Sequence, residues 1–116
     1  MSFAKNVFIN CPFDEAYINN LLKPILYIVI KNGLNPRLSL EISDSGQVRL
    51  HKITEIIQSC KYGIHDLSIV KSKKANEFAR MNMPFEFGID YGLRKSGIAQ
   101  LKAKQFLILE ATKYDY

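Results

Sequence analysis

Short apolar, β-prone segments alternate with helix-like segments along this chain, and this alternation constrains the fold more than any other feature. Four segments are strand-like: residues 6–10, 38–41, 62–68 and 105–109. Three segments are helix-like: residues 15–32, 48–59 and 84–95. In the first two helix-like segments, apolar side chains recur at three- and four-residue spacing, as on one face of a helix. Strands that alternate with helices imply a parallel sheet with right-handed crossovers.

The 116 residues predict a single α/β domain, residues 1–116, with a sheet of four to five strands. The first and last strand segments are almost entirely apolar, which favours a sheet covered by helices on both faces. We expect at least one more helix after the last strand. The domain is therefore either truncated at its C-terminus or completed by a partner.

The composition excludes several classes of protein. A chain with 47% hydrophobic and 23% charged residues is typical of a globular domain. The longest apolar run, Ile25 to Ile30, is too short to span a membrane, and the N-terminus does not read as a signal peptide. The two cysteines of the chain, Cys11 and Cys60, form no C-x-x-C pair. We therefore expect reduced thiols and a cytoplasmic location. No metal-binding or dinucleotide-binding motif is present, so no cofactor is predicted.

The net charge of +5 would suit phosphorylated ligands or nucleic acid. The only local basic cluster is Lys71, Lys73 and Lys74, in a stretch that reads as a long loop from Val70 to Asn82. A solvated loop is the favoured interpretation. Nucleic acid remains an unsupported alternative partner.

Open parallel sheets bind ligands beyond the carboxyl ends of their strands. Glu86 is the main candidate there, because the third helix is predicted to start near Pro84. A carboxylate in a first helical turn is stabilised by free N–H groups and should stay ionised. It could then attack an anomeric carbon or stabilise an oxocarbenium-like transition state. The alternative is that Glu86 only complements the helix dipole.

Other residues at this edge have two interpretations each. Asp66 could hold a ribose hydroxyl or a water molecule, or form a local turn. Asn82 and Asp14 could contact a ligand or cap a helix. Cys11 follows a strand and could be a nucleophile, although no base is identifiable beside it. His65 should face away from Asp66, as a buried and hydrogen-bonded histidine.

Further candidate ligand-binding residues lie in two places, in and around the loop after the second strand and on the third helix. An arginine there would suit a phosphate, whereas a Glu–Arg surface pair is the simpler interpretation. The charged and polar residues of this loop are Arg37, Glu41, Asp44, Ser45 and Arg49. Gly88 would let a ligand approach the third helix closely. Phe85, Phe87 and Tyr91 are more often core residues than base-stacking platforms.

Three segments resemble a group of bacterial domains that includes nucleoside 2-deoxyribosyltransferases and Toll/interleukin-1 receptor (TIR) domains. The segments are Val7-Phe8-Ile9-Asn10-Cys11-Pro12-Phe13-Asp14, Tyr62-Gly63-Ile64-His65-Asp66-Leu67-Ser68 and Asn82-Met83-Pro84-Phe85-Glu86-Phe87-Gly88. The E-x-G-x-x-x-G run from Glu86 to Gly92 resembles the segment with the transferases' catalytic glutamate. Asp66 matches their aspartate at the third strand end.

This resemblance implies a flavodoxin-like fold and an enzyme that cuts or transfers the N-glycosidic bond of a nucleoside or NAD. Some members of the group are antiphage defence effectors. Glu86 and Asp66 would be catalytic. Ligand contacts would come from Cys11, Phe13, Asp14, Asp44, Asn82 and Gly88. The transferases build their site with a neighbouring subunit, so an oligomer or a partner protein is implied. A non-catalytic module that senses a nucleotide or binds a protein is the alternative.

Overall fold

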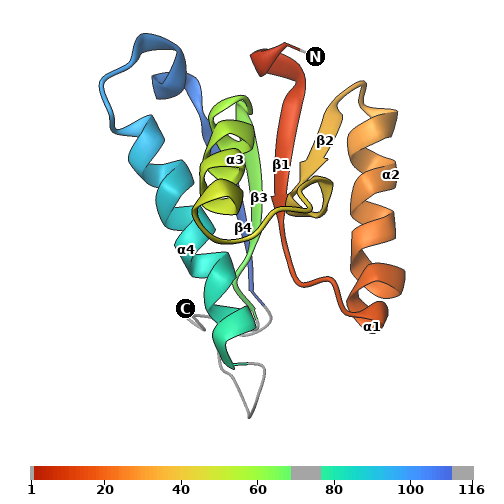
Figure 1. Cartoon of the computed structure of the whole chain (residues 1–116). Helices are drawn as coiled ribbons and strands as arrows, with labels where there is room; N and C mark the ends of the chain where they lie inside the picture. Colours follow the sequence, from red (N-terminus) through yellow and green to blue (C-terminus); the bar gives the residue numbers. More distant parts are fainter. Residues whose placement is uncertain (1, 69–76, 111–116) are drawn as a thin grey trace.

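The computed structural model describes residues 2–68 and 77–110, and its centre is a four-stranded, fully parallel sheet (Figure 1). The strands are β1 (Asn6–Asn10), β2 (Asn35–Leu38), β3 (Tyr62–Asp66) and β4 (Gln105–Leu109). The strand order is β2-β1-β3-β4. The chain therefore moves outward to β2 and then returns to the other side of β1. The junction of β1 and β3 is the topological switch point of the sheet.

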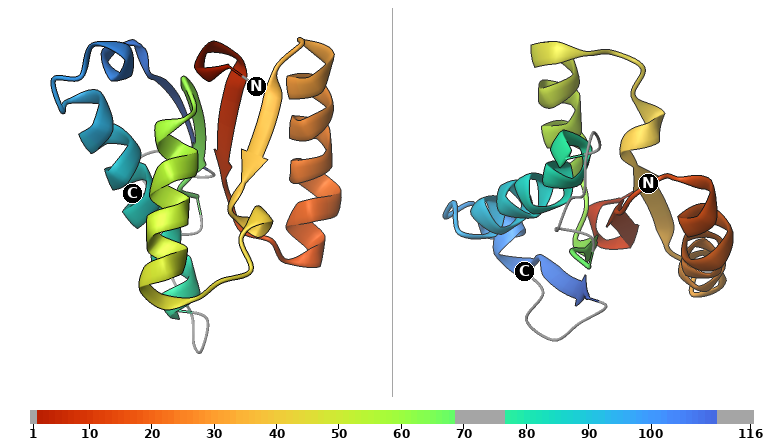
Figure 2. Two further views of the ribbon diagram at one scale, coloured as in Figure 1. Left: turned by 45° about the horizontal axis from the view of Figure 1, so that its top comes forward. Right: turned by 90° about the horizontal axis from the view of Figure 1, so that it is seen from below.

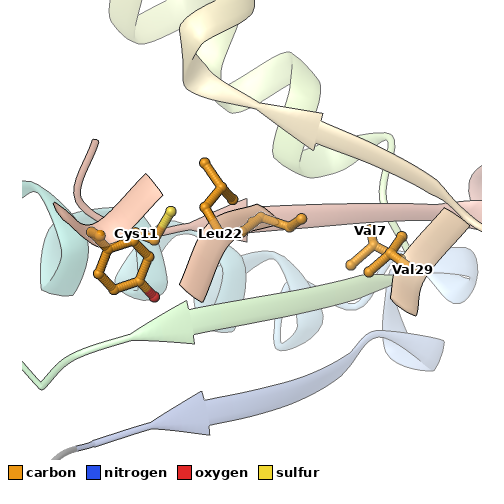
Figure 3. Packing of buried hydrophobic residues seen from close by; sticks show 6 residues of the cluster. Val7, Cys11, Leu22 and Val29 are labelled. Atoms are coloured by element: carbon orange, nitrogen blue, oxygen red, sulfur yellow. The ribbon is translucent and has the colours of Figure 1, made fainter. Parts of the chain in front are cut away.

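Helices pack on both faces of this sheet (Figure 2). They are α1 (Glu15–Tyr17), α2 (Lys23–Lys31), α3 (Gly46–Gln58) and α4 (Glu77–Arg94). Val7 and Ile9 of β1 point toward α1 and α2, whereas Phe8 points toward α3 and α4. Figure 3 shows the first of these clusters, with Val7 beside Val29. The layers and the strand order establish the predicted α/β, flavodoxin-like fold.

The predicted first helix is continuous in space but contains a wide turn. Between α1 and α2 the backbone forms a π-helical turn, Ile18–Leu22, which ends two residues before Pro24. Proline has no N–H for the helical hydrogen bond and crowds the preceding turn, which a π turn relieves. The predicted caps are confirmed. Asp14 accepts a hydrogen bond from the Tyr17 N–H, and Gly33 has a φ of 77° just after the helix.

The second strand lies earlier than predicted. The structure has β2 at Asn35–Leu38, and residues Ser39–Glu41 form a 3₁₀ turn. The carboxylate of Glu41 accepts hydrogen bonds from the Leu38 N–H and the Arg37 guanidinium, which ends the strand. The predicted Glu–Arg surface pair is therefore present. In α3, Ile53, Ile56 and Ile57 are buried, whereas Leu50, at the same helical spacing, is exposed.

The third helix was predicted to start near Pro84, and this is wrong. Helix α4 begins at Glu77, so Pro84 lies inside it. Glu86 is therefore in the middle of an 18-residue helix, where the dipole of a first turn does not act. Asn82 likewise cannot cap this helix. Lys71, Lys73 and Lys74 lie outside the described residues.

The last strand is less covered than predicted. β4 is an edge strand, and each of its residues is exposed or half-buried, whereas all five residues of β1 are buried. Leu107 is 55% exposed on the same face of the sheet as α2. Apolar composition predicted the strand correctly, but it did not reveal that this strand lies at an edge.

Candidate functional site

A cavity of about 340 Å³ opens at the carboxyl end of β1, next to the switch point of the sheet. Its walls come from the loop after β1, the 3₁₀ turn after β2, the start of α3 and the middle of α4. The lining residues are Asn10, Cys11, Pro12, Phe13, Asp14, Ser39, Arg49, Asn82, Met83 and Glu86. Segments far apart in the sequence thus meet where the topology rule expects a ligand.

Glu86 is a buried carboxylate without a partner among the described residues. It lines the cavity and is only 8% exposed, yet it forms no ion pair and no hydrogen bond there. Burial raises the pKa of Glu86 to about 7, and the positive charge of Arg49 opposes this rise. The prediction that Glu86 is held fully ionised by a helix N-terminus is therefore wrong. At neutral pH both protonation states are populated.

Cys11 lies at the same end of β1, but its environment disfavours a thiolate. Burial, together with the negative charges of Asp66, Glu86 and Asp14, raises the pKa of the Cys11 thiol to about 12. Nucleophilic cysteines have a lowered pKa instead. Two of these carboxylates, Asp14 and Glu86, line the same cavity as Cys11.

Asp66 is buried, and its carboxylate is satisfied by its surroundings. One oxygen accepts a hydrogen bond of 2.5 Å from the Tyr17 hydroxyl. The other accepts from the backbone N–H of Ser68 at 2.9 Å and from the Ser68 hydroxyl. Asp66 is not among the residues that line the cavity. It ties β3 to the helix that carries Tyr17 and closes a local turn.

The remaining predicted ligand residues divide into two groups. Phe13, Asp14 and Asn82 line the cavity with Cys11. Asp44 instead forms an ion pair of 2.5 Å with Lys52 and does not line it. Gly88 lies on an exposed part of α4 that is not part of the cavity lining.

Asn10, Ser39 and Met83 line the cavity but were not predicted as site residues. Asn10 carries a signal that could have revealed it, because it is a polar residue at the carboxyl end of a buried strand, directly after the apolar run Val7-Phe8-Ile9. Arg49 was considered only as one of several loop charges. Its guanidinium donates to the Ile42 carbonyl at 3.0 Å and forms no ion pair with a described carboxylate.

Two classes of feature are missing from the described part of the chain. Residues 2–68 and 77–110 contain no group of three or more histidine, cysteine, aspartate or glutamate side chains arranged to hold a metal ion. Over the same residues, no helix is long and apolar enough to cross a membrane.

Comparison of the coordinates with solved structures finds a 2-desoxiribosyltransferase from Leishmania mexicana, with a TM-score of 0.51. The match covers 93% of this chain and 65% of that chain. The chain shares the fold of the transferase. Sequence identity is 19%, so the likeness concerns the fold and not the activity. No family model and no curated protein matches the sequence.

Proposed function

We propose that this domain binds a nucleoside or nucleotide and breaks its N-glycosidic bond. The observation that carries this proposal is a buried, unpaired carboxylate, Glu86, in a cavity at the switch point of the sheet. Burying a carboxyl group without a partner is unfavourable and is often retained for function. The shared fold with a 2-desoxiribosyltransferase supports the same class of chemistry.

In the proposed reaction, the Glu86 carboxylate attacks the anomeric carbon of the sugar. A bond forms between a carboxylate oxygen and this carbon, while the bond to the base nitrogen breaks and the base leaves with the electron pair. Water then attacks the glycosyl-enzyme ester, releases the free sugar and restores the carboxylate. Transfer to a second base in place of water would give a transferase.

Other residues of the cavity have roles consistent with their positions. Asn82 and Asp14 can bind sugar hydroxyls, and Phe13 and Cys11 form an apolar surface beside the base. Asp66 acts indirectly, because it holds Tyr17 and the turn at the end of β3. Arg49 has guanidinium donors left for a phosphate group. The cavity volume of about 340 Å³ suits one nucleoside or nucleotide unit.

The test is to incubate purified protein with NAD, 2′-deoxynucleosides and their 5′-phosphates and to measure release of the free base. We expect base release by the wild type and at least a hundredfold lower rate for Glu86→Gln. Glu55→Gln is the matched control, because Glu55 is an exposed carboxylate on α3. No release from any substrate, or equal rates for wild type and Glu86→Gln, would refute catalysis.

The hydrogen bonds that Asp66 already accepts favour one alternative, a domain that binds a nucleotide without breaking its N-glycosidic bond. Both oxygens of this carboxylate are engaged by Tyr17 and Ser68, so Asp66 is not free to act as a second catalytic carboxylate. Such a module would bind the same nucleotides in calorimetry without releasing any base. The further role in phage defence rests on the sequence resemblance alone. Loss of protection in cells that carry Glu86→Gln would test it.

A further inference from the structure

Behind the cavity lies a chain of buried polar side chains that the proposed reaction does not use. Asp90 and Lys104 form an ion pair of 2.8 Å, and both side chains are fully buried. The Lys104 ammonium also donates to the carbonyls of Ile57, at 2.9 Å, and Cys60. The second oxygen of Asp90 lies 2.7 Å from Nε2 of His65, which is also fully buried.

This chain continues from His65 to the floor of the cavity. The side-chain amide nitrogen of Asn10 lies 3.0 Å from Nδ1 of His65 and 2.7 Å from the Met83 carbonyl oxygen. Asn10 itself lines the cavity. The buried chain thus runs from Lys104, just before β4, through α4 and β3 to β1, and it ends at a residue that lines the cavity.

The donor and acceptor in each hydrogen bond of this buried chain can be assigned by starting from the Met83 carbonyl. The Met83 carbonyl only accepts, so the Asn10 atom beside it must be the NH₂ group. That group only donates, so Nδ1 of His65 accepts and carries no proton. The His65 proton is therefore on Nε2, where it donates to Asp90. Lys104 compensates the charge of Asp90.

One atom of Asn10 is left free by this arrangement. Both hydrogens of its NH₂ group are used, one by His65 and one by Met83. No described residue donates to the Asn10 carbonyl oxygen. The amide cannot turn over without placing its oxygen against the Met83 carbonyl, which would leave buried groups unsatisfied.

We propose that Asn10 is a ligand-binding residue whose side-chain oxygen accepts a hydrogen bond from a ribose hydroxyl. His65 is the positioning residue that fixes the amide in this orientation, with Asp90 and Lys104 behind it. This inference rests on the proposed nucleotide site, but not on turnover. A free, fixed acceptor selects ligands with a hydroxyl and disfavours analogues without it.

The test measures binding of three probes by calorimetry in the Glu86→Gln protein, so that turnover does not interfere. The probes are adenosine 5′-monophosphate, its 2′-deoxy analogue and its 3′-deoxy analogue. We expect one deoxy analogue to bind about tenfold more weakly, the size of one hydrogen bond. Adding Asn10→Ala should reduce this preference to about twofold or less.

Two substitutions of His65 separate positioning from general stability. His65→Asn keeps an acceptor near the Nδ1 position, whereas His65→Gln keeps a donor toward Asp90 and loses that acceptor. We expect His65→Asn to retain the hydroxyl preference and His65→Gln to lose most of it. Thermal unfolding and a heteronuclear spectrum of each variant establish that it is folded.

The outcomes distinguish this inference from the proposed function. An unchanged hydroxyl preference in Asn10→Ala, or equal effects of the two His65 variants, overturns the inference alone. Binding with the expected preference but no base release by wild type overturns only the catalytic proposal. If none of the three nucleotides binds, the inference is overturned, and the catalytic proposal is decided by the base-release assay.

Discussion

Glu86 shows how one side chain can have a location that the sequence predicts and an environment that it does not. Its position at the ligand-binding edge followed from the order of strands and helices. The protonation state of Glu86 was not predicted correctly, because the prediction placed this residue in a first helical turn. The structure places it inside α4, where burial controls its pKa. Burial of one side chain depends on what packs against it, and sequence spacing does not specify that.

The raised pKa of Glu86 makes a prediction about stability. Below pH 4.5 the carboxyl is protonated in both the folded and the unfolded chain. As the pH rises from 4.5 to about 7, the unfolded chain ionises first, so the free energy of unfolding falls. The loss is complete above pH 7 and amounts to about 3 kcal/mol at most. Urea denaturation at pH 5 and pH 8 measures it.

Glu86→Gln should remove this pH dependence and be more stable than wild type at pH 8. Glu55→Gln should retain the fall. Equal pH dependence in wild type and Glu86→Gln would show that Glu86 is not buried as described.

Cys11 gives a second prediction at the scale of one residue. Its raised pKa leaves almost no thiolate at neutral pH, so it should not act as a nucleophile. We expect Cys11→Ser to keep base-release activity within about threefold of wild type. A loss comparable to that of Glu86→Gln would instead support a nucleophilic thiol.

At the scale of elements, predictions succeeded where hydrophobic pattern was sufficient and failed at ends that depend on side-chain contacts. β1, β3 and β4 lie where apolar runs predicted them. The start of α4 was missed because proline, a common first residue of helices, also occurs inside them. β2 was shifted because Glu41 folds back onto Arg37 and Leu38, a contact that alternation cannot show.

Gly63 tests how closely β3 and α4 approach each other. A Cβ atom at Gly63 would lie 2.6 Å from Nε2 of His65 and would also contact a carboxylate oxygen of Asp90. Both side chains are held in the buried chain, so they cannot move away. We expect Gly63→Ala to lower the free energy of unfolding by about 2 kcal/mol or more.

Gly92→Ala is the matched control, because nothing lies within 4 Å of a Cβ atom there and the residue is on exposed α4. It should raise stability by about 0.5–1 kcal/mol through helix propensity. Chemical denaturation of both variants checks the pair. A Gly63→Ala protein as stable as wild type would contradict the close packing of β3 and α4.

At the scale of the whole molecule, the fold class could be predicted from the sequence, and the buried chain from Lys104 to Asn10 could not. The alternation of segments determines the layers, and the shared fold with the Leishmania transferase agrees with it. The hydrogen bonds of this buried chain join residues separated by as many as 73 positions in sequence. Only His65 was predicted to be buried and hydrogen-bonded, and this is confirmed.

The ion pair of Asp90 and Lys104 predicts a stability effect that involves several elements. Lys104→Met leaves the Asp90 charge buried without its partner, which typically costs about 3–5 kcal/mol. Adding Asp90→Asn removes the charge, so the double variant should be more stable than Lys104→Met alone. Urea denaturation of the single and double variants measures this. Additive losses would mean that the two residues are not coupled.

The pH dependence of kcat/KM for base release is the most direct test of the central claim, that the ionised Glu86 carboxylate attacks the sugar. With the best substrate of the base-release assay, kcat/KM of wild type should rise with pH and level off above about 7, as Glu86 ionises. Glu55→Gln should show the same profile, and Glu86→Gln should have almost no activity at any pH. A profile that falls through pH 7, or one shared by Glu86→Gln, would contradict the claim.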